Sequence, residues 1–125
     1  MTENELSKVI VHCCFKIHST LGPGLLESVY EELLSYELKK ESLVFSRQQG
    51  IPLVYDNVKL DLGFRSDIIV ENKVIVEIKS VELIAPVHQK QLLTYLRITG
   101  IKLGLLVNFN EALIKDGIQR IVNGL

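Results

Sequence analysis

Glu77 and Lys79 are two charged side chains at the end of the otherwise apolar run 74–79, and a third charged side chain, Asp67, stands ten residues before Glu77. Side chains of a β-strand point alternately to its two faces, so Glu77 and Lys79 would share one face of a strand over residues 74–79. Ile75 lies on the same face, which is therefore not a simple solvent surface. Charged groups at the end of an apolar strand cost free energy unless they are paired or bind something. The pattern therefore indicates a binding or catalytic site.

A polar turn, Glu71-Asn72-Lys73, separates the apolar runs 64–70 and 74–79. Two extended runs joined by so short a polar segment predict an antiparallel hairpin. Across this hairpin Asp67 comes close to Lys79, so that two carboxylates and an amine converge.

This combination suits a hard divalent cation such as Mg²⁺ or Mn²⁺, which takes carboxylate oxygens, waters and substrate phosphate as ligands. Such an ion polarises a phosphoryl group and lowers the pKa of a bound water, and a neighbouring lysine stabilises the negative charge that develops. The alternative is a surface hairpin with an ordinary ion pair, because an acidic residue two positions before a lysine is common.

A further acidic candidate is Glu27, in the segment Gly24-Leu-Leu-Glu27-Ser-Val-Tyr30. Glu27 lies three residues after Gly24 and three before Tyr30, so the three share one face of a helix. The alternative is a solvated helical glutamate.

A polar stripe is expected on the helix that follows Pro86. His88, Gln91 and Tyr95 stand at positions i, i+3 and i+7 of this helix. Their side chains are candidates for positioning the substrate, since Gln91 and Tyr95 can orient a phosphate or a water by hydrogen bonding. The alternative is a boundary face between core and solvent.

The elements that must hold these residues follow from the apolar periodicity. Helices are expected over residues 4–19, 25–40 and 86–99, with a break at Leu21-Gly22-Pro23-Gly24 and an end at Gly100. The C-terminal tail is a short helix or a helix plus a strand. Strands are expected over residues 44–48, 51–55, 58–62, 64–70, 74–79 and 102–109, with a turn at Asp56-Asn57. The order of two helices, a meander of strands, a helix and a strand is typical of an α/β or α+β fold.

Size and composition predict one globular domain over residues 1–125. The chain has 125 residues, a net charge of -1 and a 47% hydrophobic content. The adjacent Cys13 and Cys14 fall in an apolar helix, so we expect buried thiols and a reducing cytoplasm. We expect neither a signal peptide nor a membrane span.

The segment from Gly24 to Tyr30 resembles the signature of the GxxExxY family, which belongs to the PD-(D/E)XK nuclease superfamily. The resemblance extends from about residue 5 to Gly124. It includes Arg65-Ser66-Asp67, Val76-Glu77-Ile78-Lys79, Gln91-Leu-Leu-Thr-Tyr95-Leu and Gly104-Leu-Leu-Val-Asn108-Phe109. Ser66 stands where the superfamily's name has proline.

The resemblance implies a restriction-endonuclease-like α/β core, with a central mixed sheet flanked by helices. It implies that Asp67 and Glu77 are metal carboxylates, with the Ile78 carbonyl as a further ligand. Lys79 would be the catalytic lysine, and Glu27 the acidic residue that the first core helix contributes to the catalytic and metal site.

The same resemblance assigns Gln91 and Tyr95 to the additional motif of RecB-type exonucleases. It implies a nuclease that uses Mg²⁺ or Mn²⁺, with DNA favoured over RNA as the substrate. Phosphate contacts would come from basic residues near the site: Lys39, Lys40, Arg47, Arg65, Lys90, Arg97 and Lys102.

Two alternatives to a nuclease remain at this point. One is a non-catalytic module of the same fold that binds nucleic acid or protein; the other is an α/β domain with an incidental ion-pair cluster. A nuclease of this size could also act as a homodimer that cuts one strand per subunit, and the sequence does not choose between monomer and dimer.

Overall fold

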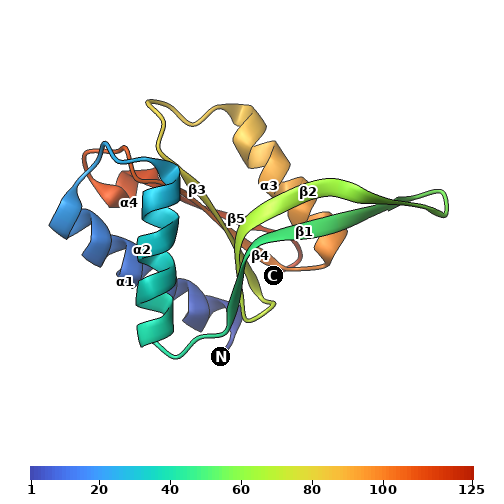
Figure 1. Ribbon diagram of the computed structural model, residues 1–125, viewed down its shortest axis with the longest axis horizontal. Coiled ribbons are helices and arrows are strands. Elements are labelled where there is room, and N and C mark those ends of the chain that lie inside the picture. The colour runs from blue at the N-terminus through green and yellow to red at the C-terminus, as the bar shows by residue number, and fades with distance from the viewer.

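The computed structural model describes residues 1–61 and 63–125. Over these residues five strands form one mixed sheet, in the spatial order β1 (Phe45–Tyr55), β2 (Val58–Val70), β3 (Val74–Lys79), β4 (Leu103–Asn108) and β5 (Ile118–Val122). Helices α1 (Glu3–Leu21) and α2 (Glu27–Lys40) lie on one side of this sheet and α3 (Pro86–Thr99) on the other (Figure 1). This is the α/β arrangement of a central mixed sheet between helices that the sequence predicts.

Helices α1 (Glu3–Leu21) and α2 (Glu27–Lys40) cover one face of the sheet. Helix α1 begins at a capping box in which Glu5 N–H donates to Thr2 Oγ1 at 3.1 Å and Thr2 N–H donates to Glu5 Oε1 at 2.9 Å. Cys13 and Cys14 are free thiols on its buried face, as expected.

The hairpin on which the site prediction depends is present. Strand β2 (Val58–Val70) pairs antiparallel with β3 (Val74–Lys79) across the turn at residues 71–73. Strand β3 then pairs in parallel with β4 (Leu103–Asn108) through the crossover helix α3 (Pro86–Thr99).

The C-terminal tail is a helix plus a strand. Helix α4 (Ile114–Gly117) leads directly into β5 (Ile118–Val122), which pairs antiparallel with β4. The sequence left this choice open.

The four short strands expected between residues 44 and 70 are two long ones, which corrects that prediction. Strand β1 (Phe45–Tyr55) and β2 form an antiparallel ribbon that projects as an arm beyond the sheet (Figure 1). Its tip is the predicted turn, with positive φ of 49° at Asp56 and 66° at Asn57. Gly63 does not break the strand; a Cβ there would lie 2.3 Å from the Ile51 carbonyl oxygen, so the close ribbon requires glycine. The expected strand 58–62 ends on Leu62, whose side chain lies outside the described residues.

Alternating residues of β3 divide the core into two layers. Val74, Val76 and Ile78 join the cluster under α1 and α2, whereas Ile75 joins the cluster under α3. The face of Ile75 is thus the face of Glu77 and Lys79, and it is covered by α3.

In the described part of the chain, no helix is long and apolar enough to cross a membrane.

Candidate functional site

The candidate site lies where β2 and β3 separate. Their paired register ends at Ile68 and Val76, so Asp67 and Glu77 are the first residues beyond it. The Ile78 N–H donates to Asp67 Oδ2 at 2.8 Å. A carboxylate of β2, and not a main-chain carbonyl, therefore accepts this hydrogen bond and lies against β3.

Glu77 is a buried residue, and one of its two carboxyl oxygens has no hydrogen-bond partner. Its side chain faces the α3 layer, the residue is 8% exposed, and its Oε1 has no hydrogen-bond partner. The other buried side-chain oxygen without a partner among the described residues is Ser66 Oγ, next to Asp67 in sequence. Burial, and then the charge of Asp67, raise the pKa of Glu77 to about 9, while Lys79 acts in the opposite direction. The structure thus brings Asp67, Glu77 and Lys79 together.

Helix α3 places Tyr95 beside these carboxylates. The Tyr95 ring stacks on Phe64 with centroids 3.9 Å apart and an angle of 4° between the planes. Burial and the charges of Glu77 and Asp67 raise the pKa of Tyr95, and the neighbouring Gln91 side chain acts in the opposite direction. Tyr95 of the predicted polar stripe therefore reaches the site, whereas a role for the exposed Gln91 stays a prediction.

The third member of that stripe, His88, has a structural contact at the start of α3. The Ala85 N–H donates to His88 Nδ1 at 3.1 Å, which caps the first turn of the helix. A role for His88 in positioning substrate stays a prediction.

Glu27 ties the start of α2 to the end of β3. The Ser80 N–H, one residue after Lys79, donates to Glu27 Oε2 at 3.0 Å. Ser80 Oγ also donates to the Leu25 carbonyl oxygen at 2.7 Å. Glu27 and Asp67 line a common hollow of about 430 Å³, whose other lining residues are Ser28, Glu31, Gln48 and Ile78.

The structure adds Glu31 and Gln48, which the sequence reasoning missed. Glu31 is 7% exposed, and its Oε1 accepts a hydrogen bond from Gln48 Nε2 at 2.7 Å. Gln48 Nε2 also donates to Asp67 Oδ1 at 3.2 Å. The signal available in the sequence was that Glu31 lies one helical turn after Glu27, on the same face of α2.

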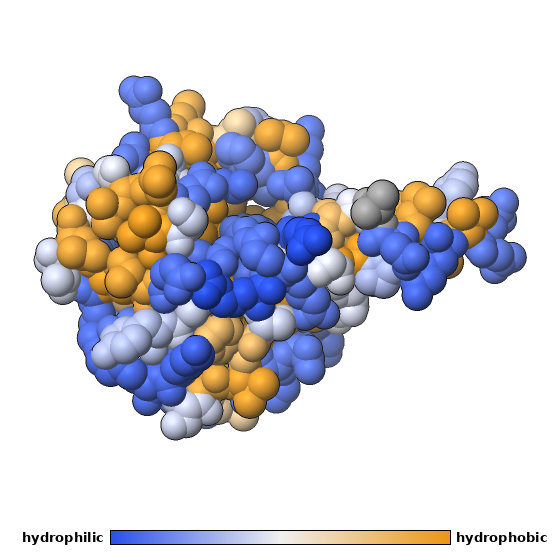
Figure 2. Space-filling view, in the orientation of Figure 1, coloured by the Kyte–Doolittle hydropathy of each residue, from blue (hydrophilic) through white to orange (hydrophobic). Residues whose placement is uncertain are grey.

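One of the basic residues expected to contact phosphate, Arg47, is engaged within the protein. Arg47 Nη2 forms salt bridges with Glu31 at 2.9 Å and with Glu32 at 3.1 Å, so this guanidinium is already paired. In the space-filling view, hydrophilic residues gather between α2 and the base of the arm (Figure 2). That polar surface is mixed in charge and is not a basic patch.

A divalent cation fits the donor set, although the protein would not enclose it. Among the described residues, no group of three or more His, Cys, Asp or Glu side chains could hold a metal ion. Mg²⁺ is commonly bound through one or two carboxylates, with waters and substrate phosphates as the other ligands. Asp67 and the unpartnered oxygen of Glu77 match that incomplete first shell.

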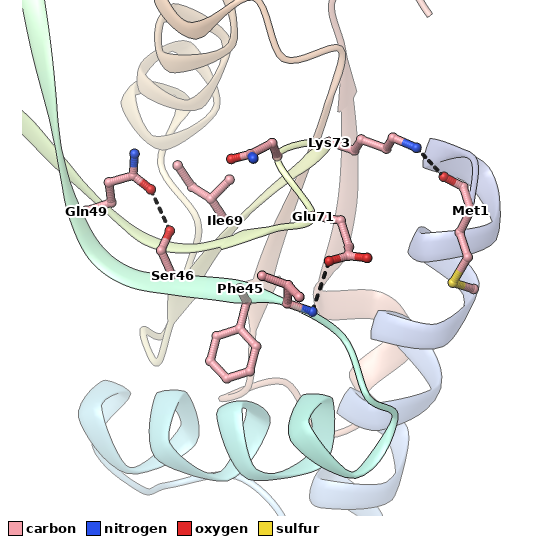
Figure 3. A pocket seen from close by; sticks show the side chains of 9 residues that line it. Met1, Phe45, Ser46, Gln49, Ile69, Glu71 and Lys73 are labelled. Atoms are coloured by element: carbon pink, nitrogen blue, oxygen red, sulfur yellow. Dashed lines mark hydrogen bonds between the residues drawn. The ribbon is translucent and has the colours of Figure 1, made fainter.

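A second hollow near the N-terminus differs in character (Figure 3). Its volume is about 360 Å³, and its charged side chains form hydrogen bonds with main-chain atoms. Glu71 Oε2 accepts a hydrogen bond from the Val44 N–H at 2.9 Å, and Lys73 Nζ donates to the Met1 carbonyl oxygen at 2.6 Å. The place where β2 and β3 separate is therefore the better candidate for a catalytic site.

An α/β fold that carries an aspartate on one strand and a Glu-x-Lys motif on the next defines a nuclease-like class of protein. Residues 4–121 match the family model of the PD-(D/E)XK nuclease superfamily. The chain belongs to this superfamily. No curated protein and no solved structure matched the chain.

Proposed function

We propose that the protein is a divalent-metal-dependent phosphodiesterase of the GxxExxY type that cleaves nucleic acid, with DNA favoured over RNA. The observation that carries the proposal is the buried Oε1 of Glu77, which has no partner and lies beside the Asp67 carboxylate. Two adjacent carboxylates in a largely buried place repel each other when both are ionised, and a cation removes that cost.

Each residue has a role in this proposal. Asp67 and Glu77 hold the cation, with the Ile78 carbonyl as an additional ligand, and Glu27, which accepts a hydrogen bond from the Ser80 N–H, adds negative charge from α2 without being a third carboxylate ligand. When bound, Mg²⁺ or Mn²⁺ supplies Lewis-acid polarisation of the phosphate and an activated water. Lys79 stabilises the negative charge that develops on the phosphoryl oxygens.

Gln91 and Tyr95 orient the scissile phosphate from α3. The Tyr95 ring is held by its stack on Phe64, so its hydroxyl is fixed relative to the carboxylates. A pre-positioned donor contributes more to the transition state than a mobile one, because its orientation is already established.

The test is cleavage of several substrates with Mg²⁺ or Mn²⁺: supercoiled DNA, linear duplex DNA, single-stranded DNA and structured RNA. The proposal expects cleavage by the wild type and loss of cleavage in Lys79→Ala and Glu77→Gln, with the far-ultraviolet circular dichroism spectrum unchanged. Cleavage by Lys79→Ala at the wild-type rate would contradict the mechanism. Binding of these nucleic acids without cleavage by the wild type would favour a non-catalytic binding module.

A further inference from the structure

Gln48 has a backbone conformation that is unusual for its place. Among the described residues, six residues other than glycine have positive φ, and Gln48, with φ of 49°, is the one inside a strand. The other five lie in turns, where this conformation is common: Ser42, Asp56, Asn57, Glu71 and Asn72. A left-handed residue inside a strand is strained, and such strain persists where the surroundings hold it in place.

The left-handed backbone changes the direction of the Gln48 side chain. Consecutive residues of a strand point to opposite faces. Yet Arg47 and Gln48 both contact Glu31: Arg47 Nε donates to Glu31 Oε2 at 3.0 Å, and Gln48 Nε2 donates to Glu31 Oε1 at 2.7 Å. Gln48 lies opposite Asp67, between the pairs Arg47–Ile68 and Gln49–Ser66, so the amide is on the side of Asp67 by register, and its contact with Glu31 accompanies the positive φ.

The amide of Gln48 links two carboxylates from different layers. Its Nε2 donates to Glu31 of α2 and, at 3.2 Å, to Asp67 Oδ1 of β2. The other oxygen of Asp67 accepts from the Ile78 N–H at 2.8 Å. Asp67 is therefore held from both sides, and Glu31 is itself fixed by Arg47.

We propose that Gln48 is a positioning residue, which orients the Asp67 carboxylate for the cation while Glu31 and Arg47 fix its amide. The proposal rests on the proposed function, because it concerns the same metal carboxylate. Residues that orient a metal ligand from behind commonly change metal affinity by about 10- to 100-fold when they are removed.

The test compares Gln48→Gly with Gln49→Gly. Glycine accepts positive φ without strain, so Gln48→Gly removes the amide and relieves the backbone at the same time. Gln49 is the neighbouring strand residue, and its side chain accepts a hydrogen bond from Ser46 in the hollow near the N-terminus. Gln48→Asn is a second variant, because asparagine tolerates the left-handed conformation but is too short to bridge both carboxylates.

Three quantities are measured on each protein: the thermal midpoint, the hydrogen-exchange rate of the Ile78 amide relative to Val76 without metal, and the dissociation constant for Mn²⁺. In Gln48→Gly we expect a thermal midpoint no lower than that of Gln49→Gly, Ile78 exchange several-fold faster, and Mn²⁺ binding weaker by about tenfold. Gln48→Asn is expected to show the same faster exchange of the Ile78 amide and the same weaker binding of Mn²⁺.

The outcomes separate this inference from the proposed function. If Ile78 exchange is unchanged in both Gln48 variants, or if it rises while Mn²⁺ affinity stays at the wild-type value, Gln48 does not position Asp67 for the metal. If the wild type itself binds no Mn²⁺, the proposed function fails, and faster Ile78 exchange in the variants would still support the orientation of Asp67 by Gln48.

Discussion

The buried carboxyl group of Glu77 makes the stability of the metal-free protein depend on pH, and Glu77→Gln should remove this dependence. Burial and the Asp67 charge raise the pKa of Glu77 from 4.5 to about 9 in the folded protein. Between these values the folded state keeps a proton that the unfolded state has released. The folding equilibrium constant should therefore fall with rising pH, by up to about tenfold per pH unit, until the pH passes the folded pKa.

The magnitude follows from the linkage of one proton. Between about pH 6 and pH 8, this loss amounts to up to about 3 kcal/mol of the free energy of unfolding. Glutamine keeps the shape of the side chain and has no proton to release. The variant should therefore be close to the wild type below about pH 5 and increasingly more stable than the wild type as the pH rises.

The assay is urea unfolding in a chelating buffer at several pH values, followed by circular dichroism. The difference between wild type and variant is the informative quantity, because contributions that the two proteins share cancel in it. Glu82→Gln, at an exposed glutamate, is the matched control and should follow the wild type at every pH. Parallel stability curves for the wild type and Glu77→Gln would refute the assignment of a raised pKa to Glu77.

Three further predictions concern the site and the fold. Lys79→Ala should reduce cleavage at least about 100-fold, measured in a steady-state assay, while Mn²⁺ binding is retained. Tyr95→Phe removes the hydroxyl but keeps the aromatic stack, so it should lower cleavage while the free energy of unfolding changes by less than about 1 kcal/mol. Tyr95→Ala removes the stack as well and should cost about 3–5 kcal/mol in urea unfolding. Gly104→Ala would place a Cβ 2.9 Å from Leu92 and should cost about 1–3 kcal/mol, whereas a Cβ at Gly50 meets nothing within 4 Å and Gly50→Ala should leave stability nearly unchanged.

Much of the fold could be predicted because apolar periodicity and turn residues are local signals. Helix α3 begins at Pro86 and ends before Gly100 as expected, and the turn at residues 71–73 sets the hairpin of β2 and β3. The expected helix over residues 25–40 begins at Glu27 instead, because Leu26 has an extended backbone at the N-cap.

The arm shows where local signals were insufficient. Gly50 and Gly63 fall between the expected short strands, but both lie within long ones. In a ribbon, a glycine can mark the close approach of the partner strand, as Gly63 does opposite the Ile51 carbonyl oxygen. A single sequence does not show which strand approaches that closely.

The charged residues of the candidate site could be predicted from the sequence, but the hydrogen bonds that connect them to neighbouring residues could not. The alternation of β3 and the turn placed Glu77, Lys79 and Asp67 together. The contact of Gln48 with Glu31 depends on a left-handed residue within a strand, which side-chain alternation does not predict. Burial of Glu77 likewise depends on α3, which follows it in sequence and covers its face of the sheet.

The most direct test of the central claim is a titration of Mn²⁺ into ¹⁵N-labelled protein, followed by paramagnetic broadening of amide signals. The measurement needs no choice of nucleic acid, and it detects weak binding of an ion that substrate phosphate would help to hold. We predict selective broadening around Asp67, Glu77 and Lys79, and its loss in Asp67→Asn. Broadening elsewhere, or none at millimolar Mn²⁺, would contradict a metal site at this place.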